Sequence, residues 1–99
     1  MAKKSTTVST TASKKKVVFI IESEPGKTVS VAGTFNNWDP KKKILIDKNN
    51  EGIYQCIIML ERGTHEYKFF VEDTWCIDPK NPNFTPNDMG TLNSVLVVD

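Results

Sequence analysis

The chain has 99 residues, of which 38% are hydrophobic and 25% charged, and its formal net charge is +1. This length and composition are typical of one small globular domain, which is too short to enclose a deep catalytic cleft. Residues 17–99 hold all 12 acidic residues but only 8 basic ones, and this net negative charge disfavours nucleic acid as a partner. No apolar run is long enough to cross a membrane.

The N-terminal part of the chain differs in composition from the rest. Residues 1–15 are expected to form a disordered leader, because Ser, Thr and Lys dominate and cannot bury enough apolar surface to offset chain ordering. A folded domain is expected over residues 16–99. The leader lacks the apolar stretch of a secretory signal, and Cys56 and Cys76 do not form a CxxC pair. Both cysteines are therefore expected to be free, part-buried thiols in a cytoplasmic protein.

Short runs of β-branched and aromatic residues follow in chain order from residue 17. Strands are predicted over residues 17–21, 27–33, 44–46, 53–60, 64–72 and 92–98, with turn-forming sequences between them. Alternation predicts that Tyr54 and Leu60, and later Tyr67 and Phe69, face the core. No segment has the 3.6-residue period of a helix. The pattern predicts an all-β, immunoglobulin-like sandwich of six to seven strands with no significant helix.

Two stretches do not have the pattern of a core. The first is a predicted structured turn with the sequence Gly33-Thr34-Phe35-Asn36-Asn37-Trp38-Asp39-Pro40. An indole in such a turn either plugs the end of the sandwich or is presented to a ligand, and the turn sequence favours neither. In the second stretch, Lys68 points away from the predicted core face and Trp75 follows a turn. They are either a solvated charge and a rim residue, or part of a site.

This combination of residue types suits a sugar. A pyranose ring presents C–H groups on its faces and hydroxyl groups around its edge. An indole can stack on the face, while ammonium and amide side chains can bond to the edge. Two stacked rings with a few polar contacts predict reversible binding, with a dissociation constant of the order of μM to mM. The long segment over residues 78–90 is expected to be irregular, and such loops are often functional.

Four blocks of sequence resemble a known module and occur in the same order. They are Val31-Ala32-Gly33-Thr34-Phe35-Asn36-Asn37-Trp38, then residues 63–71 with Trp75, then Asp78-Pro79, and finally Gly90-Thr91-Leu92-Asn93-Ser94. Residues 17–99 are similar to carbohydrate-binding module family 48, a group of early-set sandwiches. The family includes the glycogen-binding domain of the AMP-activated protein kinase β subunit, and modules that precede the catalytic domains of isoamylases and glycogen branching enzymes.

The resemblance implies a non-catalytic domain that binds α-1,4-linked glucan, such as glycogen, starch or a maltooligosaccharide. In the family, two tryptophans form a platform on which glucose rings stack, and these positions correspond to Trp38 and Trp75. A lysine that contacts sugar hydroxyls corresponds to Lys68. The resemblance implies neither a cofactor nor a metal ion.

Three further positions follow from the last block of the resemblance. An asparagine that contacts a sugar edge corresponds to Asn93, and Thr91 is its neighbour. Met89 stands where the kinase module has a leucine beside the glucan, in a loop that is one residue longer here. His65 and Phe70 are interpreted as structural residues.

Two other function classes remain as alternatives. An enzyme is disfavoured, because glycoside hydrolysis needs two carboxylates about 5–10 Å apart across a cleft. One histidine and two unpaired cysteines also suggest neither a catalytic triad nor a zinc site. The stronger alternative is a protein-interaction or regulatory module that packs against a catalytic partner, with sugar binding weak or lost. The presence of both tryptophans and the lysine favours the sugar.

Overall fold

The computed structural model describes residues 14–99, which form seven β-strands in two sheets. The strands are β2 (Lys15–Glu22), β3 (Val29–Gly33), β4 (Ile53–Leu60), β5 (Gly63–Val71), β6 (Thr74–Cys76), β7 (Phe84–Pro86) and β8 (Leu92–Val98). This part of the chain contains no helix, and so none that could span a membrane. The predicted all-β sandwich is confirmed.

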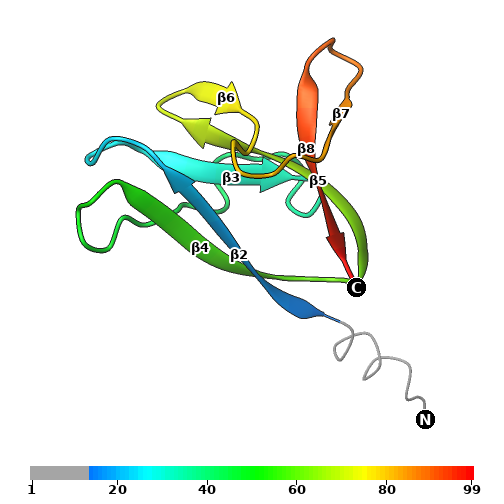
Figure 1. The fold of residues 1–99 in the computed structure, drawn as a ribbon, viewed down its shortest axis with the longest axis horizontal. Helices are drawn as coiled ribbons and strands as arrows, with labels where there is room; N and C mark the ends of the chain where they lie inside the picture. The colour runs from blue at the N-terminus through cyan, green and yellow to red at the C-terminus, as the bar shows by residue number, and fades with distance from the viewer. Residues whose placement is uncertain (1–13) are drawn as a thin grey trace.

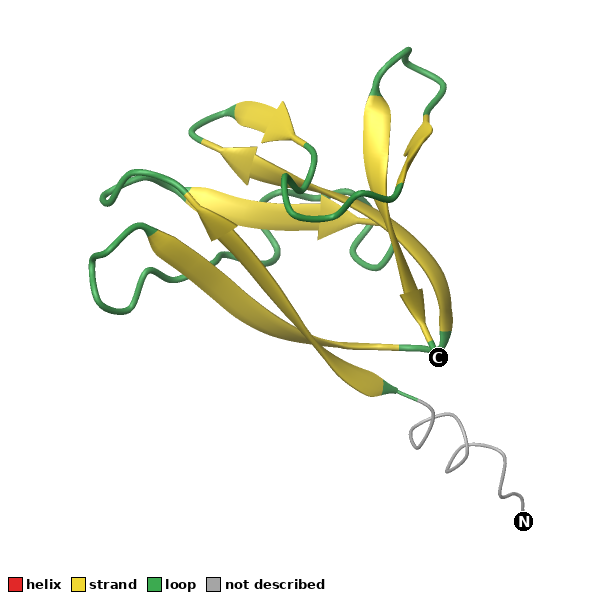
Figure 2. Cartoon of the chain, viewed as in Figure 1, coloured by secondary structure: helices red, strands yellow, loops and turns green. Residues whose placement is uncertain are grey.

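Two antiparallel sheets make up the layers of the sandwich (Figures 1 and 2). One pairs β2 with β4 along their full length, from Lys15 opposite Leu60 to Glu22 opposite Ile53. The other has the strand order β3-β5-β8-β7, and β6 also pairs with β5. The segment over residues 44–46 links the layers through two isolated bridges, one to β3 and one to β4.

The core lies between the inner faces of the two sheets. From the small sheet, alternate residues turn inward, so that Phe19 of β2 and Tyr54 of β4 are each 3% exposed. From the large sheet, Phe69 is fully buried, and the Tyr67 ring lies edge-on to Phe19 with 5.0 Å between ring centroids. Burying each such side chain contributes about 1.5–3 kcal/mol. The predicted core faces of β4 and β5 are confirmed, and their other residues turn outward.

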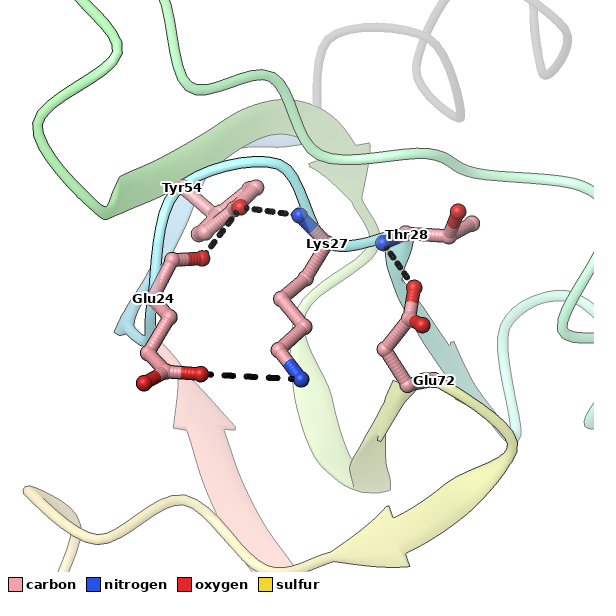
Figure 3. A network of polar contacts seen from close by, with 5 residues as sticks. All are labelled: Glu24, Lys27, Thr28, Tyr54 and Glu72. Atoms are coloured by element: carbon pink, nitrogen blue, oxygen red, sulfur yellow. Dashed lines mark hydrogen bonds and ion pairs between the residues drawn. The ribbon is translucent and has the colours of Figure 1, made fainter.

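A network of polar contacts ties the turn between β2 and β3 to both sheets (Figure 3). The Tyr54 hydroxyl donates to the backbone carbonyl of Glu24 over 2.7 Å and accepts the backbone N–H of Lys27 over 2.9 Å. The backbone N–H of Thr28 donates to a carboxylate oxygen of Glu72 over 2.6 Å. Because Glu72 lies in the turn between β5 and β6, this contact also anchors the hairpin that carries Trp75.

The strand boundaries differ from the predictions in several places. β3 begins at Val29 rather than residue 27, and β5 spans Gly63–Val71 rather than residues 64–72. β2 begins at Lys15 rather than residue 17, so it includes the last residue of the predicted leader; residues 1–13 of that leader lie outside the described residues. Residues 44–46 form bridges and not a strand, because the segment passes from one sheet to the other and cannot continue pairing with either. The strands β6 and β7 were not predicted, since three residues are too few to show alternation.

Candidate functional site

The site lies where β5 exchanges one neighbouring strand for another. Residues 63–67 of β5 pair with β8, and residues 69–71 pair with β6, so the change falls at Lys68. An open depression of about 780 Å³ lies over this split, on the outer face of the large sheet. All six residues predicted from the sequence line it: Trp38, Lys68, Trp75, Met89, Thr91 and Asn93. The other lining residues are Cys76, Ile77, Asn87, Asp88 and Leu92.

Trp38 is presented by a turn that Asn36 holds in shape. The Asn36 carboxamide accepts the backbone N–H of Gly33 over 3.0 Å and donates to the carbonyl of Val31 over 3.2 Å. The backbone N–H of Trp38 in turn donates to the carbonyl of Gly33 over 3.0 Å. These bonds keep Asn37 and Trp38 in the left-handed region, at φ values of 58° and 57°. That conformation costs a bulky residue of order 1 kcal/mol, and strain of this kind is typical of functional positions.

Gly33 allows this turn to lie directly against β5. A Cβ atom at this position would be 2.9 Å from the Cβ of Tyr67 and would clash with the backbone carbonyl oxygen of Glu66. That same carbonyl accepts the backbone N–H of Thr34 over 2.9 Å. The close approach therefore positions the Trp38 turn relative to the strand that carries Lys68.

Trp75 is positioned by the tight hairpin between β5 and β6. The two turn residues, Glu72 and Asp73, have φ values of 44° and 67°, as a two-residue turn between right-twisted strands requires. This register places Trp75 opposite Phe70, with 4.6 Å between their ring centroids. Phe70 supports one side of the indole, and Trp75 remains 43% exposed at the depression. Phe70 is thus a packing residue, as interpreted from the sequence.

Lys68 reaches across the split from β5 to the segment before β8. Its ammonium group donates to the Thr91 hydroxyl over 2.9 Å. An ammonium has three donor protons, so this contact fixes its direction while leaving others for a bound ligand. Lys68 is half-buried, and it lines the depression together with Trp38 and Trp75.

Asn87 organises the loop on the other side of the depression. Its carboxamide oxygen accepts the backbone N–H groups of Met89 over 2.9 Å and Thr91 over 3.1 Å. Its carboxamide nitrogen donates to the Thr91 hydroxyl over 2.7 Å and to the Asn93 carboxamide oxygen over 2.9 Å. The loop therefore has one defined shape, which holds Met89 at its tip with 87% of that residue exposed.

Asn93 lines the depression but is largely engaged within the protein. It is 7% exposed, its carboxamide oxygen accepts from Asn87, and its carboxamide nitrogen donates to Glu66 over 2.9 Å. Sequence reasoning missed Asn87 and Glu66. A signal for Asn87 was available, because an asparagine three residues before Gly90 is a common way to cap a turn. Glu66 gave none, since its role depends on strand pairing.

The two thiols are free and half-buried, as predicted. Burial raises the pKa of Cys56 to about 11, an effect that the nearby Lys43 ammonium partly offsets. Burial, and then the Asp78 carboxylate, raise the pKa of Cys76, which lies at the edge of the depression. Both therefore remain protonated and unreactive near neutral pH. Within residues 14–99, no cluster of three acidic, histidine or cysteine side chains is suited to hold a metal ion.

Comparison with known proteins places this geometry in a family. The family model described as the glycogen recognition site of AMP-activated protein kinase matches residues 15–99. The chain belongs to this family. Members of the glycogen-recognition family are non-catalytic binding domains, so the chain is a binding domain and not an enzyme.

Several protein kinase subunits are similar in sequence to this glycogen-recognition domain. The β-2 subunit of the AMP-activated protein kinase of Mus musculus is 40% identical over 76 residues, which cover 77% of this chain and 27% of that subunit. The β-2 subunit of Homo sapiens is 40% identical over the same length, covering 26% of the subunit. The β-1 subunit of Rattus norvegicus is 40% identical over 73 residues, which cover 74% of this chain and 25% of that subunit. The matched region spans about a quarter of the length of these relatives.

Proposed function

We propose that the chain binds the α-1,4-linked glucan of glycogen or starch in the depression, with glucose rings stacked on Trp38 and Trp75. The observation that carries this proposal is that Trp38, Lys68 and Trp75 line one open depression. The proposal is further supported by membership of a family described by its glycogen recognition site. A glucan chain would thereby meet two stacking surfaces and a donor at its hydroxyl edge.

The energetics favour modest, reversible binding. If each indole removes about 100 Å² of apolar surface from water, each contributes about 2–3 kcal/mol before ordering costs. Lys68 and Thr91 add hydrogen bonds to sugar hydroxyls from positions that their mutual contact already fixes. Met89 offers an exposed, flexible thioether against which the apolar face of the glucan can pack. Asn93 contributes mainly by orienting Asn87, since its own amide is satisfied inside the protein.

The proposal is tested by measuring how single substitutions affect glucan binding. Trp75→Ala removes one stacking surface, and Trp38→Asn removes the other while tolerating the left-handed backbone of the turn. Each is expected to weaken binding of maltoheptaose by roughly 10- to 100-fold in calorimetry, consistent with about 2–3 kcal/mol per ring. Phe84→Ala is the matched control, because Phe84 is an aromatic residue 52% exposed that does not line the depression.

Two results would contradict the proposal. One is wild-type affinity for maltoheptaose in both tryptophan variants, with circular dichroism showing that they are folded. The other is an equal loss of affinity in the Phe84→Ala control. Co-sedimentation with glycogen, competed by β-cyclodextrin, extends the same comparison to the polymer.

A second candidate function is association with a protein kinase in the cytoplasm. The similarity to β subunits of AMP-activated protein kinase favours it. This function is compatible with glucan binding, because a domain of two layers can present one face to a sugar and another to a protein. Co-purification with a kinase catalytic subunit, unchanged by Trp75→Ala, would support it.

A further inference from the structure

The outer face of the small sheet is largely apolar, and within residues 14–99 no segment buries it. The residues that alternate with the core residues of β2 and β4 are exposed, so their side chains point away from the sandwich. Figure 1 shows β2 and β4 in the layer opposite β6 and β8. Ile46 joins them, because it bridges to the outward residue Gln55 of β4. The exposed apolar residues of this face are Val18, Ile20, Ile46, Ile53, Ile57 and Met59, each 40–60% exposed. We call this set the apolar face; isolated exposed apolar residues are common, whereas a contiguous set indicates a docking surface.

The two ends of the apolar face carry opposite charges. Lys16, opposite Met59, lies at the end where β2 begins. Glu22, opposite Ile53, lies at the other end of the same strand and points to the same side. Further acidic residues, Glu24 and Glu51, lie near Glu22 in a shallow surface hollow. The face is therefore a strip that is basic at one end, acidic at the other, and apolar in the middle except for Gln55, which lies opposite Ile20.

We propose that two copies of this chain associate through their apolar faces, related by a two-fold axis near the middle of β2. A two-fold rotation about that point would place Lys16 of each copy beside the partner's Glu22 and bury Val18 and Ile20 between them. The strip is thus complementary to itself, as an isologous interface requires. Glu22 makes an ion pair with Lys80 at 3.2 Å, but both side chains are about two-thirds exposed, and exposed pairs contribute little stability.

The size of the strip predicts a weak dimer. Strands of eight residues are about 26 Å long, and three adjacent extended segments are about 14 Å wide, so each copy would cover about 400 Å². A standard stable interface covers about 800 Å² per partner. Association is therefore expected only at high protein concentration, with a dissociation constant of roughly 0.1–1 mM.

If the proposed glucan site is correct, this dimer would have a functional consequence. The depression and the apolar face lie on opposite layers of the sandwich, so dimerisation would leave both depressions open and facing outward. Glycogen presents many chains, and a dimer could therefore engage two at once. Binding through two linked sites can strengthen attachment to a polymer by on the order of 100-fold without any new contact.

Sedimentation equilibrium of the full chain over roughly 10 μM to 1 mM, without sugar, tests the dimer directly. The wild-type chain is expected to show concentration-dependent dimerisation that Ile57→Glu abolishes. Val97→Glu is the matched control, since Val97 is 61% exposed but belongs to the large sheet. A chain that stays monomeric throughout, or dimers that persist in Ile57→Glu, would overturn the proposal.

Charge exchange tests the predicted orientation of the two copies. Lys16→Glu and Glu22→Lys would each place like charges together and should weaken dimerisation by roughly 3- to 10-fold, whereas the double variant should restore it. A double variant no better than the single ones would refute the two-fold arrangement. Failure of the glucan site is distinguishable, because Trp75→Ala should still dimerise. Conversely, Ile57→Glu should keep its affinity for maltoheptaose while binding glycogen more weakly.

Discussion

Replacement of Asn87 by alanine tests whether the loop over residues 87–91 must be held in shape before the glucan binds. The side chain of Asn87 makes four hydrogen bonds, two to backbone N–H groups and one each to the side chains of Thr91 and Asn93. Alanine removes all four. All four bonds lie within the protein, so we expect the loss of affinity to come from the loop, even though Asn87 itself lines the depression.

The magnitude follows from the number and exposure of these bonds. A protein hydrogen bond contributes about 0.5–1.5 kcal/mol net, and Asn87 is half-buried, so water would compensate for part of the loss. We expect unfolding free energy to fall by about 1–2 kcal/mol. If the loop is disordered in the variant and must become ordered when the sugar binds, the free energy of binding is reduced by a similar amount. This corresponds to about 10-fold weaker binding.

Calorimetry with maltoheptaose measures the effect, and two further variants make it specific. Asn87→Asp keeps the acceptor for Met89 and Thr91 but loses both donors, so its affinity should lie between those of wild type and Asn87→Ala. Asn83→Ala is the control, because the recorded contact of this exposed residue with β8 uses its backbone carbonyl. Wild-type affinity in Asn87→Ala would refute the role of Asn87 in ordering the site.

The remaining predictions concern the site, the turn and the thiols. Lys68→Met should weaken maltoheptaose binding by roughly 5- to 20-fold in calorimetry, because charge-assisted hydrogen bonds are worth about 1–2 kcal/mol, while the melting temperature changes little. Gly33→Ala should lower the unfolding free energy in urea by about 3 kcal/mol or more through its clash with Glu66, whereas Gly26→Ala, which meets no neighbour, should cost only about 1 kcal/mol. The raised pKa of Cys56 means that its thiol ionises less readily in the folded state than in the unfolded state. Its contribution to the free energy of unfolding is therefore complete below pH 9.0 and is lost as the pH rises toward about 11. Cys56→Ser should reduce this alkaline loss by about 1–2 kcal/mol in urea titrations at several pH values, and an unchanged pH profile would contradict the assignment.

The Trp38 turn shows what could be predicted from local sequence. Glycine, asparagine and aspartate close together indicate a structured turn, because their side chains and backbone satisfy one another over short distances. The structure realises these contacts between Asn36 and its near neighbours Gly33 and Val31. Whether the indole plugged the fold or lined a site could not be derived from these contacts. That depended on β5, which is distant in sequence.

Asn93 and Trp75 are residues whose place at the site could be predicted from the sequence but whose surroundings could not. Both were expected at the site, and both line the depression. The hydrogen-bond partners of Asn93, however, are Glu66, 27 residues before it, and Asn87, 6 residues before it. Only the register of β5 against β8 brings Glu66 beside the other two. For Trp75, the strand β6 is too short to be recognised, and its pairing with β5 decides which face the indole occupies.

Local chemistry in the sequence determined the longer strands, their inward and outward faces, the turn residues and the types of side chain available to a sugar. These properties depend on neighbours within a few residues, where alternation and backbone preferences act directly. Only the tertiary structure decided that β5 changes partner at Lys68, that Asn87 orders the binding loop, and that one outer face remains apolar. Each of these depends on which strands pair and in what register. The energy of pairing two segments that are far apart in the chain depends on both segments together, so it cannot be predicted from either one alone.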